Sequence, residues 1–183
     1  YIVKIIDNTS VKADGWHHRT DSLSSFILWG PPGTGKTTLA RIISEETNSE
    51  FYQLNAVSSG VKDVRNVIER AKLNQNHNLK TILFIDEIHR LGRAVEEVLY
   101  PAMEDFVLDI IVGKGPGAKN VRLKLPKFTV IGATTRLALM TAPLRARFGA
   151  VYRMDFYEMA AMETIVTRGA GSLRGPIEPA GAA

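Results

Sequence analysis

The sequence has 183 residues, of which 45% are hydrophobic and 23% are charged, proportions typical of one globular domain with its own core. It contains no cysteine, which excludes disulfides, thiolate metal sites and a cysteine nucleophile. The formal net charge of +4 permits an anionic partner without requiring one. No apolar run approaches the roughly 20 residues that span a bilayer, so we expect no membrane segment and a cytoplasmic location.

Short apolar runs alternate with amphipathic segments along most of the chain, starting at Phe26. The amphipathic segment at 61–74, for example, places Val64, Val67 and Ile68 on one side of a helix. The helix at 93–105 is expected to be interrupted or kinked near Pro101. In chain order, the pattern predicts strands at 26–29, 51–55, 81–86 and 128–135, and helices at 36–46, 61–74, 93–105 and around 142–148.

Strands that alternate with helices predict an α/β fold, in which a parallel sheet is flanked by helices on both faces. The run at 81–86 is typical of a strand buried on both sides. We therefore expect one domain at 26–168, preceded by an unassigned polar segment at 1–25. Residues 169–183 are rich in Gly, Ala and Pro, which favours a linker or the truncated start of another domain.

A glycine-rich turn after the first strand fits the phosphate-binding pattern G-x-x-x-x-G-K-[ST]. Its glycines let the backbone N–H groups face phosphate oxygens, and the helix that begins at the lysine adds its positive end. In this pattern Lys36 reaches the β- and γ-phosphates and the Thr37 hydroxyl ligates Mg²⁺. The flanking strand and helix favour this interpretation over a chance glycine turn. The predicted nucleotide-binding residues are Gly30, Pro31, Pro32, Gly33, Thr34, Gly35, Lys36, Thr37 and Thr38.

Asp86 ends the strand at 81–86, and a second acid, Glu87, follows it. An acid at the end of a buried strand is costly unless it meets a cation or a metal ion. Mg²⁺ held by the phosphate loop would meet Asp86, and Glu87 would then orient or polarise the attacking water. The alternative is an acidic strand end that caps the following helix.

Two further motifs add candidate catalytic residues. The strand at 128–135 ends in Thr134 and Thr135, and either hydroxyl could sense the γ-phosphate or the attacking water. Arg145 and Arg147 follow a proline, and an arginine placed outside its own site can serve a neighbouring subunit in trans. Spacing alone favours the alternative of two solvated arginines.

The stretch at 107–125 predicts a β-hairpin with one apolar and one basic face. The tip, GKGPG, has the backbone freedom that a reversal needs. An exposed apolar ribbon suggests a protein partner; the alternatives are packing on this domain's own helices, or DNA contact through Arg122, Lys124, Lys114 and Lys119. The apolar face is predicted to contain Leu108, Ile110, Val112, Val121, Leu123 and Leu125.

The order of these motifs, GPPGTGKTT, FIDE, GATTR and PLRARFG, resembles that of the AAA+ ATPases. Residues 82–157 closely resemble the RuvB family of Holliday-junction branch-migration motors. Residues 26–81 are more similar to the RarA/MgsA family of clamp-loader-like ATPases at stalled replication forks, so the sequence has the character of a mosaic. Residues 1–25 match neither family, and the tail PIEPAGA resembles the start of a small second domain of RuvB.

The hairpin favours RuvB over RarA, because RarA-type proteins pass from the acidic motif to the sensor strand with little between them. The resemblance implies the large domain of an AAA+ P-loop NTPase, with the hairpin inserted before the sensor strand. It also implies a homo-hexamer around double-stranded DNA, with ATP and Mg²⁺ between subunits and a RuvA-like junction-binding protein on the hairpin.

The resemblance also assigns roles to single residues. Glu87 activates water, Asp86 holds the metal, and Thr135, with Thr134 second, senses phosphate. Arg147, which precedes FG, is preferred to Arg145 as the residue that reaches the next subunit. Since the family also uses residues from further domains, we expect weak nucleotide binding and poor hydrolysis from these 183 residues alone. A RarA-like ATPase and a non-catalytic interaction module are the alternatives.

Overall fold

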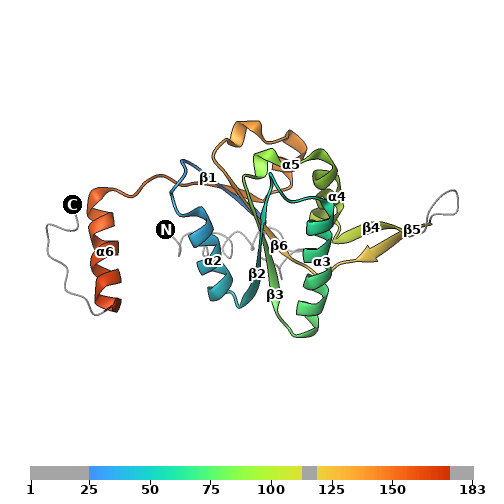
Figure 1. Cartoon of the computed structure of the whole chain (residues 1–183), viewed down its shortest axis with the longest axis horizontal. Coiled ribbons are helices and arrows are strands. Elements are labelled where there is room, and N and C mark those ends of the chain that lie inside the picture. Colours follow the sequence, from blue (N-terminus) through green and yellow to red (C-terminus); the bar gives the residue numbers. More distant parts are fainter. Residues whose placement is uncertain (1–24, 113–118, 174–183) are drawn as a thin grey trace.

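The computed structural model describes residues 25–112 and 119–173, which build a central sheet with helices on both faces and a projecting hairpin (Figure 1). The strands are β1 (Phe26–Trp29), β2 (Ser49–Asn55), β3 (Lys80–Asp86), β4 (Val107–Val112), β5 (Lys119–Lys124), β6 (Thr129–Thr134) and β7 (Ala150–Arg153). The helices are α2 (Lys36–Glu46), α3 (Val61–Asn76), α4 (Arg93–Glu104), α5 (Ala142–Ala146) and α6 (Met159–Leu173), with 3₁₀ turns η2 (Ile88–Arg90) and η4 (Leu137–Leu139).

The central sheet has five strands in the order β2-β3-β6-β1-β7, and every neighbouring pair is parallel. This confirms the predicted parallel α/β fold. Trp29 at the end of β1 pairs with Thr134 at the end of β6, and Asp86 ends β3 beside Asn55. The carboxyl ends of the central strands therefore meet at one edge of the sheet, where ligands bind in open parallel sheets.

Both faces of the sheet are buried, because side chains alternate along each strand. On β3, Ile82 and Phe84 pack with the apolar side of α2, whereas Leu83 and Ile85 pack with α3 and α4. Each of these four side chains is at most 1% exposed. This burial explains why the strand is an unbroken apolar run and confirms the prediction made for residues 81–86.

The hairpin of β4 and β5 is antiparallel, with Leu108 opposite Leu123 and Ile110 opposite Val121. Its base belongs to the domain core: Leu108 is 3% exposed, and Leu125, which follows β5, is 8% exposed. The Leu125 N–H donates to the Phe106 carbonyl over 2.7 Å and closes the base. Leu125 was predicted on the partner face, and this is wrong, because the side chain packs into the domain itself.

Farther out, the apolar face of the hairpin is partly exposed to solvent. Val121 is 38% exposed and its neighbour Ile110 is half-buried. On the opposite face, Arg122 donates two hydrogen bonds to Asp109, over 2.9 and 3.0 Å. This pairing lowers the pKa of Asp109, chiefly through the hydrogen bonds from Arg122. The tip, with Lys114, and the Val112 side chain lie outside the residues described.

The fold differs from the predicted elements in three places. Helix α4 continues through Pro101 without the predicted interruption, while a kink there stays a prediction, and the Asp105 N–H still donates to the Pro101 carbonyl over 3.0 Å. Strand β7 extends the sheet beside β1, although its four residues were not predicted as a strand. Helix α6 runs on to Leu173, so the expected boundary at Gly169 falls inside a helix.

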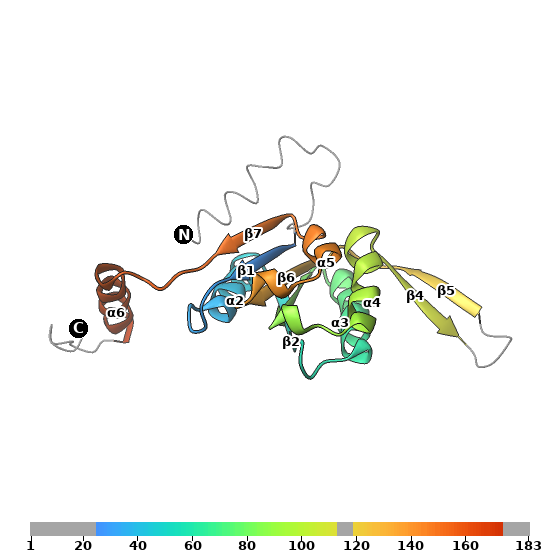
Figure 2. The same ribbon diagram turned by 90° about the horizontal axis from the view of Figure 1, so that it is seen from above.

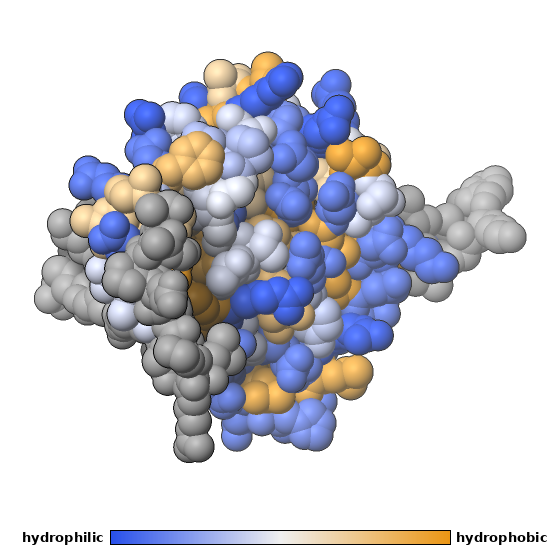
Figure 3. Space-filling view, turned by 60° about the vertical axis from the view of Figure 1, so that its left-hand side comes forward, coloured by the Kyte–Doolittle hydropathy of each residue, from blue (hydrophilic) through white to orange (hydrophobic). Residues whose placement is uncertain are grey.

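The hairpin and α6 lie at opposite ends of the molecule in both ribbon views (Figure 2). The face shown in Figure 3 is mostly hydrophilic, with apolar residues in small separate patches. Large exposed apolar side chains gather along the chain that leaves β7, at Phe156, Tyr157 and Met159. Among the helices that the structure describes, none is both long and apolar enough to cross a membrane.

Candidate nucleotide-binding and hydrolysis site

The loop between β1 and α2 curls back over the edge of the sheet. The Gly30 N–H donates to the Thr134 carbonyl over 3.2 Å, which ties the start of the loop to β6. Gly33 and Gly35 have φ values of 80° and 78°, a conformation that L side chains rarely adopt. Gly35 caps α2, so the loop ends at a helix N-terminus whose N–H groups can bind an anion.

Gly30 is required for a second reason, which is a close backbone contact. A Cβ atom added at Gly30 would lie 1.9 Å from the Met154 carbonyl oxygen. The Met154 N–H in turn donates to the Trp29 carbonyl over 2.7 Å. The start of the phosphate loop is therefore packed against the chain that leaves β7, a contact that the sequence pattern did not predict.

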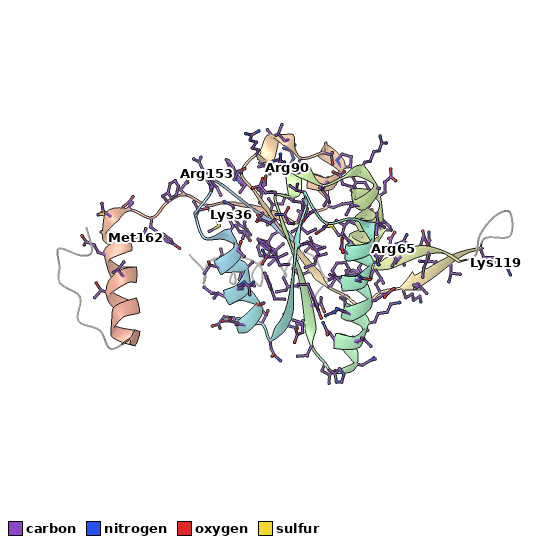
Figure 4. All side chains as sticks on the ribbon, in the orientation of Figure 1. Lys36, Arg65, Arg90, Lys119, Arg153 and Met162 are labelled. Atoms are coloured by element: carbon purple, nitrogen blue, oxygen red, sulfur yellow. The ribbon has the colours of Figure 1, made fainter. Side chains whose placement is uncertain are left out.

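Lys36 is the first residue of α2 and directly follows the loop (Figure 4). Its Nζ donates to the Gly30 and Pro31 carbonyls over 3.0 and 2.6 Å, and to the Thr34 hydroxyl over 3.0 Å. Burial lowers the pKa of Lys36, and the nearby carboxylates of Asp86 and Glu87 oppose that shift. The site thus brings a cation and two acids together at the edge of the sheet.

The two acids lie at the end of β3 in different backbone conformations. The Asp86 carboxylate accepts the Glu87 N–H over 3.0 Å. Glu87 has a φ of 52°, in the left-handed region, and begins the turn η2. A carboxylate at Asp86 and a hydroxyl at Thr37 are the hard oxygen ligands that Mg²⁺ prefers, and both stand next to the lysine loop, so these residues fit the ion.

The ends of β3 and β6 are joined by a histidine that the sequence analysis missed. His89 Nδ1 lies 2.8 Å from the Thr134 hydroxyl oxygen, and His89 Nε2 lies 3.5 Å from a Glu87 carboxylate oxygen. Thr134 is 1% exposed, whereas Thr135 is half-buried beside it. Of the two threonines, Thr135 therefore has the more accessible side chain.

Arg147 lies at the C-terminal end of the short helix α5, and its side chain packs against its own domain. Its guanidinium group is 3.9 Å from the centre of the Tyr100 ring and forms a 3.2 Å salt bridge with Glu104. It also donates to the Pro143 carbonyl over 2.7 Å. The side chain is 19% exposed. Arg145, by contrast, is exposed, so the prediction of two solvated arginines holds for Arg145 alone.

Tyr100 is itself held by a buried acid, Glu96. Its hydroxyl donates to Glu96, which also accepts a hydrogen bond from Thr141 over 2.9 Å. Burial, followed by the hydrogen bond to Glu96, raises the pKa of Tyr100. The ring beneath Arg147 is therefore a neutral aromatic surface in a fixed position. The spacing of the apolar residues on α4 did not reveal this network.

A five-stranded parallel sheet, a lysine-bearing glycine loop after β1 and an acidic pair at the end of β3 define a P-loop NTPase domain of the AAA+ class. The family model of the Holliday junction DNA helicase RuvB P-loop domain matches residues 2–154. The chain belongs to the RuvB family.

Curated relatives and solved structures agree with this family. The chain is 49% identical over 179 residues to the Holliday junction branch migration complex subunit RuvB of Chloroflexus aggregans, covering 98% of this chain and 50% of that protein. It is 52% identical over 169 residues to the RuvB subunit of Dehalococcoides mccartyi, covering 91% and 46%. The Thermotoga maritima RuvB Holliday junction branch migration motor superimposes with a TM-score of 0.72 at 34% identity, covering 99% and 53%. The chain spans about half the length of the curated relatives it matches.

The family match changes one expectation about the first half of the chain. Residues 26–81 were interpreted as more similar to RarA/MgsA, and residues 1–25 as matching neither family. The RuvB model begins at residue 2 and continues through residue 81 to residue 154. The prediction that residues 1–25 match neither family is therefore wrong. Residues 26–81 also match the RuvB family, and their greater similarity to RarA/MgsA stays a prediction.

Proposed function

We propose that this chain is the nucleotide-binding part of an ATP-driven DNA motor that promotes branch migration of Holliday junctions. The observation that supports this most directly is the cluster of Lys36, Asp86 and Glu87 at the edge of the sheet. Burial lowers the pKa of the lysine there, and the two nearby carboxylates raise it. Membership in the RuvB family supports the proposal that the substrate is DNA. The names of the relatives place them in a branch migration complex.

In the proposed reaction, the loop N–H groups and Lys36 bind the β- and γ-phosphates of ATP. A phosphate oxygen would replace some of the three loop oxygens that now accept hydrogen bonds from the lysine. Thr37 and Asp86 would hold Mg²⁺, which neutralises charge on the phosphates when bound. Glu87 orients the attacking water, and Thr135 donates to the γ-phosphate.

The last group would come from another subunit. Arg147 of one subunit reaches the nucleotide of its neighbour and stabilises charge in the transition state. We infer a homo-hexamer around double-stranded DNA, in the cytoplasm. Residues 26–168 would form the large ATPase domain, and residues 169–183 would lead toward a further domain, with α6 crossing that boundary.

Replacing Lys36 with alanine tests the nucleotide site. We expect at least a tenfold to hundredfold weaker affinity for Mg-ATP, because one or two charge-assisted hydrogen bonds contribute about 1.5–3 kcal/mol each. The affinity is measured by titration with a fluorescent ATP analogue. Lys62→Ala, on the exposed side of α3, is the matched control and should bind like the parent chain. Unchanged binding by the Lys36→Ala protein would contradict the assignment of the phosphate loop.

The hairpin is proposed to dock a RuvA-like junction-binding protein through its apolar face. Ile110→Asp together with Val121→Asp should abolish this binding, because the two side chains are cross-strand partners and Val121 is 38% exposed. The measurement is calorimetric titration with the junction-binding protein. Lys124→Ala, which changes an exposed lysine on β5, is the control and should leave binding within a few fold.

Leu108 and Leu125 are left intact in this test because both are buried and contribute to folding. Binding that survives in the aspartate variant would reject the apolar face as the docking site. The alternative of DNA contact through the opposite, basic face is weakened, because the charge of Arg122 is paired with Asp109.

A further inference from the structure

We propose that His89 is a positioning residue, which ties the carboxylate of Glu87 to the hydroxyl group at the end of β6. This inference rests on the proposed function, because it concerns the residue assigned to water activation. The His89 side chain is 7% exposed and lies between Glu87 and Thr134. Two separate chain segments, the turn after β3 and the end of β6, thus meet at one imidazole ring.

The hydrogen-bond donors and acceptors around the ring fit one neutral tautomer. The Thr134 hydroxyl oxygen accepts the Arg136 N–H over 3.0 Å, which leaves the hydroxyl proton to be donated to His89 Nδ1. The ring proton is then on Nε2, which is the nitrogen that faces Glu87. The Glu87 carboxylate oxygen can only accept, so it favours the proton on Nε2, and the Thr134 hydroxyl, which can donate or accept, then donates to Nδ1.

The contact with Glu87 is looser than the contact with Thr134. A separation of 3.5 Å exceeds an ordinary N–H···O hydrogen bond, whereas 2.8 Å to Thr134 is short. The Nε2–H group therefore orients the carboxylate through a long, weak contact, and the Glu87 oxygens can still accept a hydrogen bond from a water molecule. A shift at the end of β6 would move the ring first and the carboxylate with it.

The turn that carries His89 is held firmly. The Arg90 N–H donates to the Glu87 carbonyl over 2.8 Å, and Ile88 is completely buried. A Cβ added at Gly132 on β6 would lie 2.8 Å from the Ile88 side chain, so η2 packs directly on that strand. Because the backbone is fixed on both sides, the orientation of the Glu87 side chain depends mainly on its neighbour His89.

The test uses four variants of the same chain: His89→Ala, Thr134→Val, the double variant, and Thr134→Ser as the conservative control. Single-turnover hydrolysis of Mg-ATP should fall at least tenfold in both single variants. The double variant should be no slower than the slower single variant, because both changes break one connection. Thr134→Ser keeps the hydroxyl group, so its hydrolysis rate should stay within about threefold of the parent rate. That is a smaller change than we expect from the loss of one neutral hydrogen bond.

Two further readouts separate positioning from a merely structural role. Affinity for the fluorescent ATP analogue should change little in all four variants. All four should stay folded, with the melting temperature lowered by roughly 2–4 °C for each buried hydrogen bond that is lost. A His89→Ala protein that hydrolyses at the parent rate would overturn the proposal, as would one that loses nucleotide binding or folding in parallel with hydrolysis. Loss of nucleotide binding by the parent chain would instead contradict the proposed function.

The ring itself gives a readout that needs no turnover. In ¹⁵N NMR spectra, the parent chain should show His89 protonated on Nε2, with Nδ1 shifted by an accepted hydrogen bond. Thr134→Val should remove the Nδ1 shift, and Glu87→Gln should move the Nε2 signal. An Nδ1 signal that is identical in the parent and in Thr134→Val would refute the connection, whatever the hydrolysis rates are.

Discussion

Replacing Arg147 with alanine should lower ATP turnover by assembled subunits about 10³–10⁵-fold, the range known for arginines that act on a neighbour's nucleotide. Nucleotide binding to each subunit should persist, because the Arg147 side chain lies on Tyr100 and Glu104 of its own α4. The measurement is steady-state phosphate release above the concentration at which subunits assemble. Arg145→Ala is the matched control, since Arg145 is exposed two positions earlier on the same segment.

A mixing experiment shows whether Arg147 acts in trans. Subunits that carry Arg147→Ala, combined with subunits that carry Lys36→Ala, should recover part of the lost turnover. In such a pair the intact arginine of one subunit faces the intact nucleotide loop of the other. No recovery in the mixture, with assembly verified by light scattering, would place Arg147 in the structure of its own domain only.

Replacing Glu87 with glutamine should lower hydrolysis about 10²–10⁴-fold, the usual contribution of a general base or water-orienting group. Affinity for Mg-ATP should be retained, because Glu87 is not among the proposed ligands of the nucleotide or metal. Single-turnover hydrolysis and titration with the fluorescent analogue measure the two effects on the same preparation. The resulting protein should keep bound ATP unhydrolysed for longer than the parent chain does.

Glu97→Gln is the matched control for this substitution, because Glu97 is exposed on α4, where it pairs with Arg93 across one helical turn. Hydrolysis by the control should equal that of the parent chain. A Glu87→Gln protein that hydrolyses ATP at more than a tenth of the parent rate would assign water activation to another group.

Much of the sheet could be predicted from the sequence because local signals agree with tertiary burial. The run at 81–86 is apolar at consecutive positions, and both of its faces are covered, by α2 on one side and α3 with α4 on the other. The phosphate loop was predictable for a similar reason. Its glycines, its lysine and the helix after it are contiguous, so the backbone alone brings them together.

Features that join distant segments could not be predicted in this way. His89 is a single histidine after an acidic pair, and its contact with Thr134 spans 45 positions in sequence. The support of Arg147 by Tyr100 and Glu104 likewise depends on how α5 lies against α4. Strand β7 was missed because it is short. Its four residues alternate between half-buried and exposed, as in an edge strand, but four residues are too few for the alternation to be recognised in the sequence.

Leu125 shows the opposite kind of error. Alternation along β5 correctly identified one apolar face, but periodicity does not say where along a ribbon the domain ends and solvent begins. The antiparallel pairing brings Leu108 and Leu125 to the base, where both are buried, and leaves Val121 outside.

The contact between Gly30 and Met154 joins the phosphate loop to the exit of β7. The Met154 carbonyl fills the space that a Cβ of Gly30 would need, and the Met154 N–H donates to the Trp29 carbonyl, so the two segments are packed directly together. The next regular element, α6, begins only at Met159. Residues 155–158 are thus the irregular link between this packed contact and α6, so the stretch of chain that touches the phosphate loop leads directly to that helix.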